Sequence, residues 1–139
     1  MPANPLNTDD YGGELYNLAL SDKARPLLEN VKAFIRDEIE PATAEYFALG
    51  ADRQDRWSFG PGQLELLDGL KAKAKSAGLW NFFLPDADTG EGLSNLDYAY
   101  IAQELGKNPI ASECLNCSAP DTGNMEVLER VGTSEQKER

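Results

Sequence analysis

The segment from Leu93 to Gly106 has the most regular pattern in the chain, and the pattern is helical. Ser94 followed three residues later by Asp97 is a capping box in which Asp takes the place of the usual Glu or Gln. Leu93 and Tyr98 occupy the two positions of a hydrophobic staple. We therefore predict a buried helix that begins after Ser94 and is ended by Gly106. Its apolar stripe, at spacings of three and four, is Tyr98, Ile101, Ala102 and Leu105.

The chain before this segment also has apolar residues at helical spacings of three and four. Ser21 can cap a helix that runs to about Ile39. Pro41 predicts a kink or a break, after which residues 42–49 resume helically. Pro61 suits the first position of a further helix, which Gly78 ends in the left-handed conformation. The predicted inner faces are Leu28, Val31, Ile35 and Ile39 in the first helix and Leu64, Leu67, Leu70, Ala74 and Ala77 in the later one.

Two connecting segments carry apolar side chains. Residues 50–62 are charged and then rich in Gly and Pro, which predicts an exposed connection, but Trp57 and Phe59 within it need apolar cover. Residues 79–84 are aromatic and aliphatic and are stopped by Pro85. That run is too short for a useful helix, so we predict an extended, buried connector.

Helical signals continue to the end of the chain. Pro109 can open a short helix to about Asn116, and a loop at 118–123 precedes a helix ended by Gly132 that carries Met125, Leu128 and Val131. Thr133 and Gln136 form another capping box. The helix that they begin has no apolar residue and is not self-supporting, so we expect the chain to stop inside an element whose buried face lies further on. Residues 1–20 are predicted to be an irregular arm, packed by Tyr11, Leu15 and Tyr16, and residues 21–139 a helical domain.

The composition is that of a globular domain, and the net charge disfavours some classes of partner. The 139 residues suffice for one domain with a real core, and 41% hydrophobic and 27% charged residues are ordinary for a globular protein. A net charge of -11 argues against nucleic acid and anionic membranes as partners. The basic residues Lys71, Lys73 and Lys75 are expected at a solvated helix end. The sequence contains no apolar run of about 20 residues that could span a bilayer. It also shows no signal peptide, so the expected compartment is the cytoplasm.

Several chemistries are disfavoured by the residue types present. The chain contains no histidine, so it supplies neither a His base nor a His ligand. Cys114 and Cys117 are the only cysteines and cannot complete a zinc site, so they are expected to be small buried residues or to line a ligand pocket. A calcium loop beginning at Asp86 is disfavoured because Glu91 stands where its tight turn needs glycine. Glu104 is expected to be solvent-exposed rather than catalytic.

An ordered set of short motifs resembles the N-terminal α-helical domain of the acyl-CoA dehydrogenase family. The motifs are Ile39-Glu-Pro41, Lys75-Ser-Ala-Gly-Leu-Trp80, Phe83-Leu-Pro85, Gly92-Leu-Ser-Asn-Leu-Asp-Tyr98, Gln103-Glu-Leu-Gly106 and Gly132-Thr-Ser-Glu-Gln-Lys137. The chain is most similar to the subgroup whose loop reads Asn116-Cys-Ser-Ala-Pro-Asp-Thr-Gly-Asn-Met125. The resemblance covers residues 21–139.

This resemblance implies an all-α fold, an orthogonal bundle of about six helices. It also implies FAD-dependent α,β-dehydrogenation of an acyl-CoA thioester by a full-length protein that is a homo-oligomer. The catalytic base and most FAD contacts of the family lie in domains beyond this one, so no catalytic residue or flavin ligand is transferred to this chain. Part of the acyl pocket does transfer, and the predicted substrate-binding residues are Asn116, Cys117, Thr122 and Asn124.

Two other interpretations of the resemblance stay open at this stage. The chain could be a stand-alone helical interaction module that reuses the lobe without catalysis. It could also belong to a family member whose full-length form has lost dehydrogenase activity. In the leading interpretation, the chain's partners are the acyl-CoA substrate and the rest of the same polypeptide.

Overall fold

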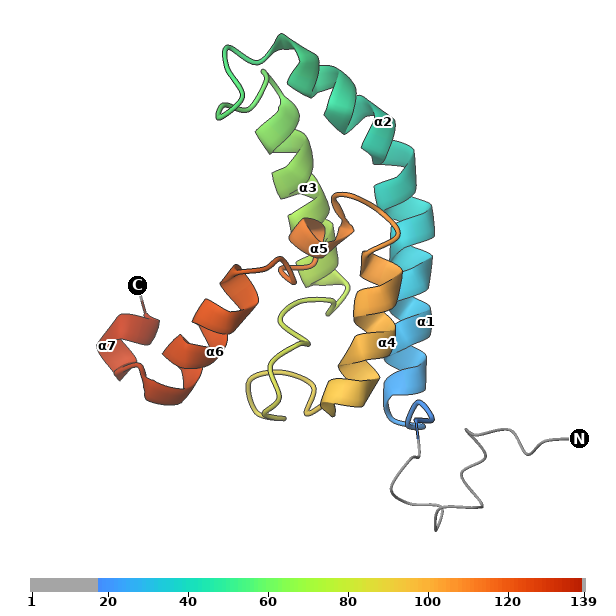
Figure 1. Ribbon diagram of the computed structural model, residues 1–139, viewed down its shortest axis with the longest axis vertical. Coiled ribbons are helices and arrows are strands. Elements are labelled where there is room, and N and C mark those ends of the chain that lie inside the picture. The colour runs from blue at the N-terminus through green and yellow to red at the C-terminus, as the bar shows by residue number, and fades with distance from the viewer. Residues whose placement is uncertain (1–17, 139) are drawn as a thin grey trace, which may run out of the picture.

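The computed structural model describes residues 18–138, and within that range every regular element is helical (Figure 1). The predicted all-α fold is confirmed, with six helices when α1, η2 and α2 are counted as one rod that η3 extends. Most of the predicted N-terminal arm, with Tyr11, Leu15 and Tyr16, lies outside the described residues. The elements in chain order are α1 (Ala24–Phe34), η2 (Ile35–Ile39), α2 (Glu40–Leu49), η3 (Gly50–Asp52), α3 (Gln63–Ser76), α4 (Asn95–Leu105), α5 (Ala111–Cys114), α6 (Asp121–Val131) and α7 (Ser134–Lys137).

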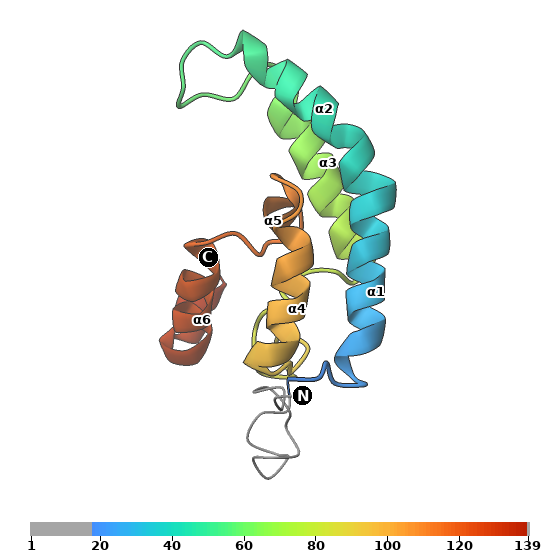
Figure 2. The ribbon, with the colours of Figure 1, turned by 45° about the vertical axis from the view of Figure 1, so that its right-hand side comes forward.

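Pro41 bends the first helix without ending it. The five residues before Glu40 form a π-helical turn, in which the Glu40 N–H donates to the Ile35 carbonyl. A wider turn at this point accommodates a proline ring, which has no N–H to donate and would meet the carbonyl of residue 37 in a regular α-helix. The Thr43 hydroxyl donates to the Ile39 carbonyl at 2.8 Å. Of the two predicted outcomes, kink and break, the structure shows the kink, and the rod curves through this turn (Figures 1 and 2).

The predicted capping box at Ser94 is present, and it does more than cap α4. The Ser94 hydroxyl accepts the Asp97 N–H at 3.1 Å. The buried Asp97 carboxylate accepts the Ser21 backbone N–H at 2.9 Å. Ser21 in turn caps α1 as predicted, because its hydroxyl accepts the Ala24 N–H at 3.2 Å. One carboxylate therefore joins the N-terminal ends of α1 and α4, which pack side by side.

Helix α3 begins two residues later than predicted. Pro61 precedes the helix, and Gly62 takes the N-cap position with φ +80°, a left-handed value that glycine adopts without steric cost. At the other end Gly78 has φ +71°, and its N–H donates to the Lys75 carbonyl at 3.1 Å, so the predicted C-terminal stop is confirmed. The predicted inner face is confirmed at three positions, Leu67, Leu70 and Ala74, and is wrong at the helix ends, where Leu64 and Ala77 are exposed.

The α2–α3 turn is held by a buried glutamine. The Gln63 side chain accepts the Gly60 N–H at 3.0 Å and donates to the Tyr46 carbonyl at 3.1 Å. Gly60 has no room for a side chain, since an added Cβ would lie 1.9 Å from the Leu49 carbonyl oxygen. Gln63 thus joins the end of α2, the end of the loop and the start of α3 at the base of the loop 53–59.

The core lies between the rod, α3 and α4, and α5 closes it. Helix α5 contacts α3, α4 and η2 and is only four residues long, shorter at both ends than predicted. The connector at 79–84 is buried as predicted, but it is not extended. It turns on itself, and Asn81 has φ +57°. The fully buried large side chains are Phe82, Ile39, Ile101, Leu105, Leu115, Val31 and Cys114.

Helices α6 and α7 project from this body (Figures 1 and 2). The predicted boundaries of α6 at Gly132 and of the capping box at Thr133 are confirmed. None of the α6 residues is buried, and Val131 is 77% exposed. Trp57, for which cover was predicted, is 81% exposed, and its ring carries only the Arg56 guanidinium, 4.5 Å from the centroid. Both regions therefore show apolar surface that the described part of the chain does not cover.

Within the described residues, no helix combines the length and the apolar character needed to cross a membrane.

Candidate functional site

Two of the predicted substrate-binding residues lie on the segment that joins α5 to α6, and the other two lie at the start of α6, which projects from the bundle (Figure 1). Asn116 and Cys117 follow α5, and the fold buries Cys117 against the core. Thr122 is half-buried in the first turn of α6, whereas Asn124 is exposed. The structure thus brings Asn116 and Cys117 to the edge of the core, whereas Thr122 and Asn124 lie further out, at the start of α6. Their role in substrate binding stays a prediction.

Two asparagines in the left-handed region clamp the start of this segment. Asn116 has φ +58° and Asn81 has φ +57°, values that asparagine tolerates better than most residues. The Asn116 amide donates to the Asn81 Oδ1 at 2.6 Å, and the same nitrogen lies 3.3 Å from the Met125 Sδ. The clamp therefore connects the 79–84 connector, the end of α5 and the first half of α6. Sequence analysis missed Asn81, although asparagine is one of the residues that turns favour.

Cys117 and Tyr98 form the apolar side of the cluster. Burial raises the pKa of the Cys117 thiol to about 12, although a hydrogen bond from Tyr98 works in the opposite direction. The pKa of Tyr98 is also raised, first by burial and then by the neighbouring Cys117 and Glu126. Both groups are therefore neutral near pH 7, so the cluster can contact an apolar ligand but offers no nucleophile.

An ion pair fixes α5, from which this segment departs. The Lys71 ammonium contacts the Glu113 carboxylate and thereby links α3 to α5. The hydrogen bond from Lys71 lowers the pKa of Glu113, against a smaller opposing effect of burial, and Ser118 contributes in the same direction as Lys71. The three lysines that were predicted to be solvated, Lys71, Lys73 and Lys75, thus each contact another side chain. Lys73 reaches Glu38 at 2.5 Å, and Lys75 lies 4.4 Å from the centre of the Trp80 ring.

The expected roles of the other candidate groups agree with the structure in part. Cys114 is completely buried, and burial raises its pKa to about 12, as suits a small core residue. Within residues 18–138, no group of three or more potential ligands could hold a metal ion. Glu104 was expected to be solvent-exposed, but it is half-buried. Its carboxylate pairs with Lys107 at 2.7 Å on the surface of α4.

Comparison with known proteins gives the geometry a context. A sequence profile for the Acyl-CoA dehydrogenase, N-terminal domain, matches residues 21–139. The chain is 47% identical over 128 residues to Acyl-CoA dehydrogenase family member 11 of Gallus gallus, covering 90% of this chain and 15% of that relative. It is 46% identical over 142 residues to family member 10 of Mus musculus, covering 99% of this chain and 13% of that relative.

A solved structure shows the same arrangement of helices. It comes from Mycobacterium abscessus, is assigned to the acyl-CoA dehydrogenases, and superposes with a TM-score of 0.70 at 45% identity. The match covers 86% of this chain and 30% of that one. The chain therefore spans less than a third of the solved structure and about one seventh of the two curated relatives.

Proposed function

Because this chain belongs to the acyl-CoA dehydrogenase family, of which it forms the N-terminal domain, we propose that it is one helical wall of an FAD-dependent acyl-CoA dehydrogenase. In that protein a carboxylate would act as the base for the α proton of an acyl-CoA thioester, and bound FAD would supply the hydride acceptor for the α,β-dehydrogenation. The observation that carries the proposal is the match along residues 21–139, supported by the uncovered apolar side chains of α6. We infer that the rest of the full-length polypeptide packs on these side chains.

In this proposal the described residues do not form a flavin site by themselves. Every buried side-chain nitrogen or oxygen atom among them already has a hydrogen-bond partner. The polar atoms of the Asn81–Asn116 clamp are engaged with one another. The catalytic base and the FAD contacts accordingly belong, in this proposal, to parts of the protein outside this chain.

The contribution of this chain is the acyl-chain end of the substrate cavity. Asn116, Cys117, Thr122 and Asn124 would flank it, with the neutral thiol of Cys117 facing the hydrocarbon. Small side chains at these positions leave room for a bulky or branched acyl group. Because the clamp ties Asn116 to the core, this wall would keep its shape when a substrate enters.

The proposal is tested on the full-length protein. We expect a yellow preparation whose visible flavin absorption is bleached anaerobically by acyl-CoA thioesters, whereas the 139-residue chain alone is colourless and inactive. A full-length protein that binds no flavin would contradict the proposal and would favour an interaction module.

The role of the wall is tested separately, with acyl-CoA substrates of graded length. Cys117→Trp fills the proposed space and should shift the preference toward shorter or unbranched chains, while Cys117→Ser, which is nearly isosteric, should not. The flavin spectrum of each variant shows whether it is assembled. An unchanged preference in an assembled Cys117→Trp protein would remove the acyl-wall assignment.

A further inference from the structure

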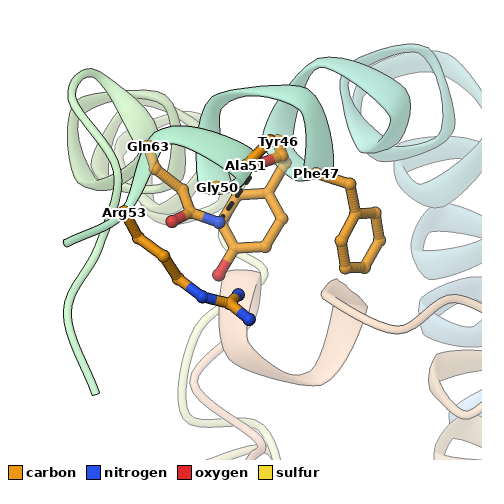
Figure 3. A pocket seen from close by; sticks show the side chains of 6 residues that line it. All are labelled: Tyr46, Phe47, Gly50, Ala51, Arg53 and Gln63. Atoms are coloured by element: carbon orange, nitrogen blue, oxygen red, sulfur yellow. Dashed lines mark hydrogen bonds between the residues drawn. The ribbon is translucent and has the colours of Figure 1, made fainter. Parts of the chain in front are cut away.

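A hollow lies at the opposite end of α3 from the Asn81–Asn116 clamp, where α2 ends and η3 begins. Its volume is about 310 Å³, at the lower end of the range of about 300–1,000 Å³ that small-molecule sites occupy. Figure 3 shows the six side chains that line it, which are Tyr46, Phe47, Gly50, Ala51, Arg53 and Gln63. None of these residues belongs to the acyl-chain wall described above.

The lining has an unusual charge for this protein. The chain has 24 acidic residues, yet no carboxylate lines the hollow, and the charged group that does is the Arg53 guanidinium. Asp52, the neighbour of Arg53 in sequence, lines a separate cavity beside the 58–65 turn. The hollow is therefore locally basic on a strongly acidic domain.

Arg53 is also unpaired. Among the cations in the described range, Arg53 and Arg130 are the two with no carboxylate, carbonyl or aromatic partner, whereas each of the others contacts at least one such group. Arg130 lies on the projecting helix α6 and lines neither of these two cavities. A free guanidinium beside a concave surface suits a carboxylate, because its planar fork can donate two parallel hydrogen bonds.

The rest of the hollow supplies a second donor and an apolar wall. In Figure 3 the Tyr46 hydroxyl points to the same side as the Arg53 guanidinium. The Tyr46 and Phe47 rings meet edge to face, with centroids 5.5 Å apart and planes at 80°. Phe47 is 53% exposed, so a ring surface is open to a ligand. The small residues Gly50 and Ala51 also line the hollow.

The lining is held in place by the buried Gln63. Its amide already binds the Tyr46 carbonyl and the Gly60 N–H, and it is only 6% exposed. Tyr46 and the start of α3 are thus fixed before any ligand arrives, which lowers the entropic cost of binding. The Arg53 side chain is the lining group that remains free to close on a ligand.

From these observations we propose that the hollow formed by Tyr46, Phe47, Ala51 and Arg53 is a binding site for a small aromatic carboxylate. Arg53 binds the carboxylate, the Tyr46 hydroxyl donates a further hydrogen bond, and the Phe47 ring packs on the aromatic body. The hollow shares no residue with the acyl-chain wall and lies at the other end of α3, so the site is separate from the proposed dehydrogenation chemistry.

The test is a titration of the 139-residue chain with benzoate, followed by amide chemical shifts in NMR. Shifts are expected at residues 50–53 and 46–47 and not at 116–125. Acetate, which lacks the ring, and benzamide, which lacks the charge, should each bind at least about fivefold more weakly. Benzoate shifts confined to other regions, or equal binding of inorganic phosphate and benzoate, would overturn the proposal.

Variants separate the site from general charge attraction. Arg53→Gln should raise the dissociation constant for benzoate about tenfold, since a hydrogen-bonded charge pair is lost. Arg130→Gln removes the other unpaired cation and should leave the constant unchanged. Ala51→Leu keeps every charge and should block the hollow by bulk. The thermal midpoint of each variant checks its folding. Equal losses in the two arginine variants, or full binding by Ala51→Leu, would refute the site. Because no flavin or acyl-CoA enters this experiment, its outcome is independent of the dehydrogenase proposal.

Discussion

Helices α4 and α6 have the same length, 11 residues each, and opposite environments. Helix α4 has a complete capping box and buries Ile101 and Leu105 in the core. Helix α6 has no side-chain cap and no buried residue, although its sequence is also amphipathic, with Leu128 and Val131 at helical spacing. The comparison shows that this chain supplies the tertiary support of α4 itself, whereas its described residues leave the apolar stripe of α6 uncovered.

The largest expected difference between the two regions is in thiol reactivity. Burial raises the pKa of both Cys114 and Cys117 from 9.0 to about 12. At pH 8 the thiolate fraction, and with it the alkylation rate, should fall on the order of a thousandfold below that of a free thiol. A Val131→Cys variant places a matched thiol on α6 and should react at the ordinary rate with iodoacetamide. Rapid alkylation of all three cysteines would show that the body opens as readily as α6.

The next largest effect is expected from matched leucine truncations. Leu105 is 1% exposed in α4 and Leu128 is 41% exposed in α6. Leu105→Ala should lower the free energy of unfolding by about 3 kcal/mol, because it removes buried methyl groups and leaves a cavity. Leu128→Ala should cost less than about 1 kcal/mol. Urea unfolding monitored by circular dichroism gives both values, and similar losses would mean that α6 is packed after all.

Removal of the α4 cap should have a smaller effect that depends on pH. Asp97→Ala should cost about 1 kcal/mol near neutral pH, as other N-terminal capping losses do. The backbone hydrogen bond from Ser21 lowers the pKa of Asp97 below its ordinary 3.8, against an opposing effect of burial. The unfolded state therefore takes up the proton first as the pH falls, so this stabilisation is present above about pH 4 and is lost below it. The matched change on α7, Gln136→Ala, should cost less, because that capping box is exposed. A cost for Asp97→Ala that is the same at pH 3 and pH 7 would contradict the assignment.

The smallest effect is expected at the tip of α6. Val131 is 77% exposed, so Val131→Ser should change the unfolding free energy of this chain by less than about 0.5 kcal/mol. The same substitution in the full-length protein should lower the thermal midpoint measurably if another part of the polypeptide covers α6. A null result in both would leave the exposed stripe without a structural role.

The parts of the fold that local chemistry determines could be predicted from sequence. The cap at Ser94, the left-handed stop at Gly78 and the bend near Pro41 each follow from the residue at that position and its neighbours. The turned connector could not be predicted, because an apolar run of six residues has no period that separates extended from folded backbone. The delayed start of α3 depends on Gln63, whose partner Tyr46 lies 17 residues away.

The candidate sites were predictable to a smaller extent. Asn116 and Cys117 were assigned to the substrate pocket through a family resemblance, and their contacts to Asn81 and Tyr98 join segments distant in sequence. The hollow at Arg53 was not foreseen, because nothing local to Arg53 shows that it lacks a carboxylate partner. Unpaired charge becomes visible only when all neighbours are placed.

The two hydrogen bonds of the Gln63 side chain at the α2–α3 turn affect how the sequence of this protein can evolve. Gln63 and the cramped Gly60 fasten the two helices at the root of the loop, whereas the hydrogen bonds of Asp55 to Trp57 and Ser58 stay within residues 53–59. Insertions and replacements in that loop should be nearly free of structural penalty. Related proteins can therefore remodel this corner, and whatever it recognises, while the scaffold beneath it stays the same.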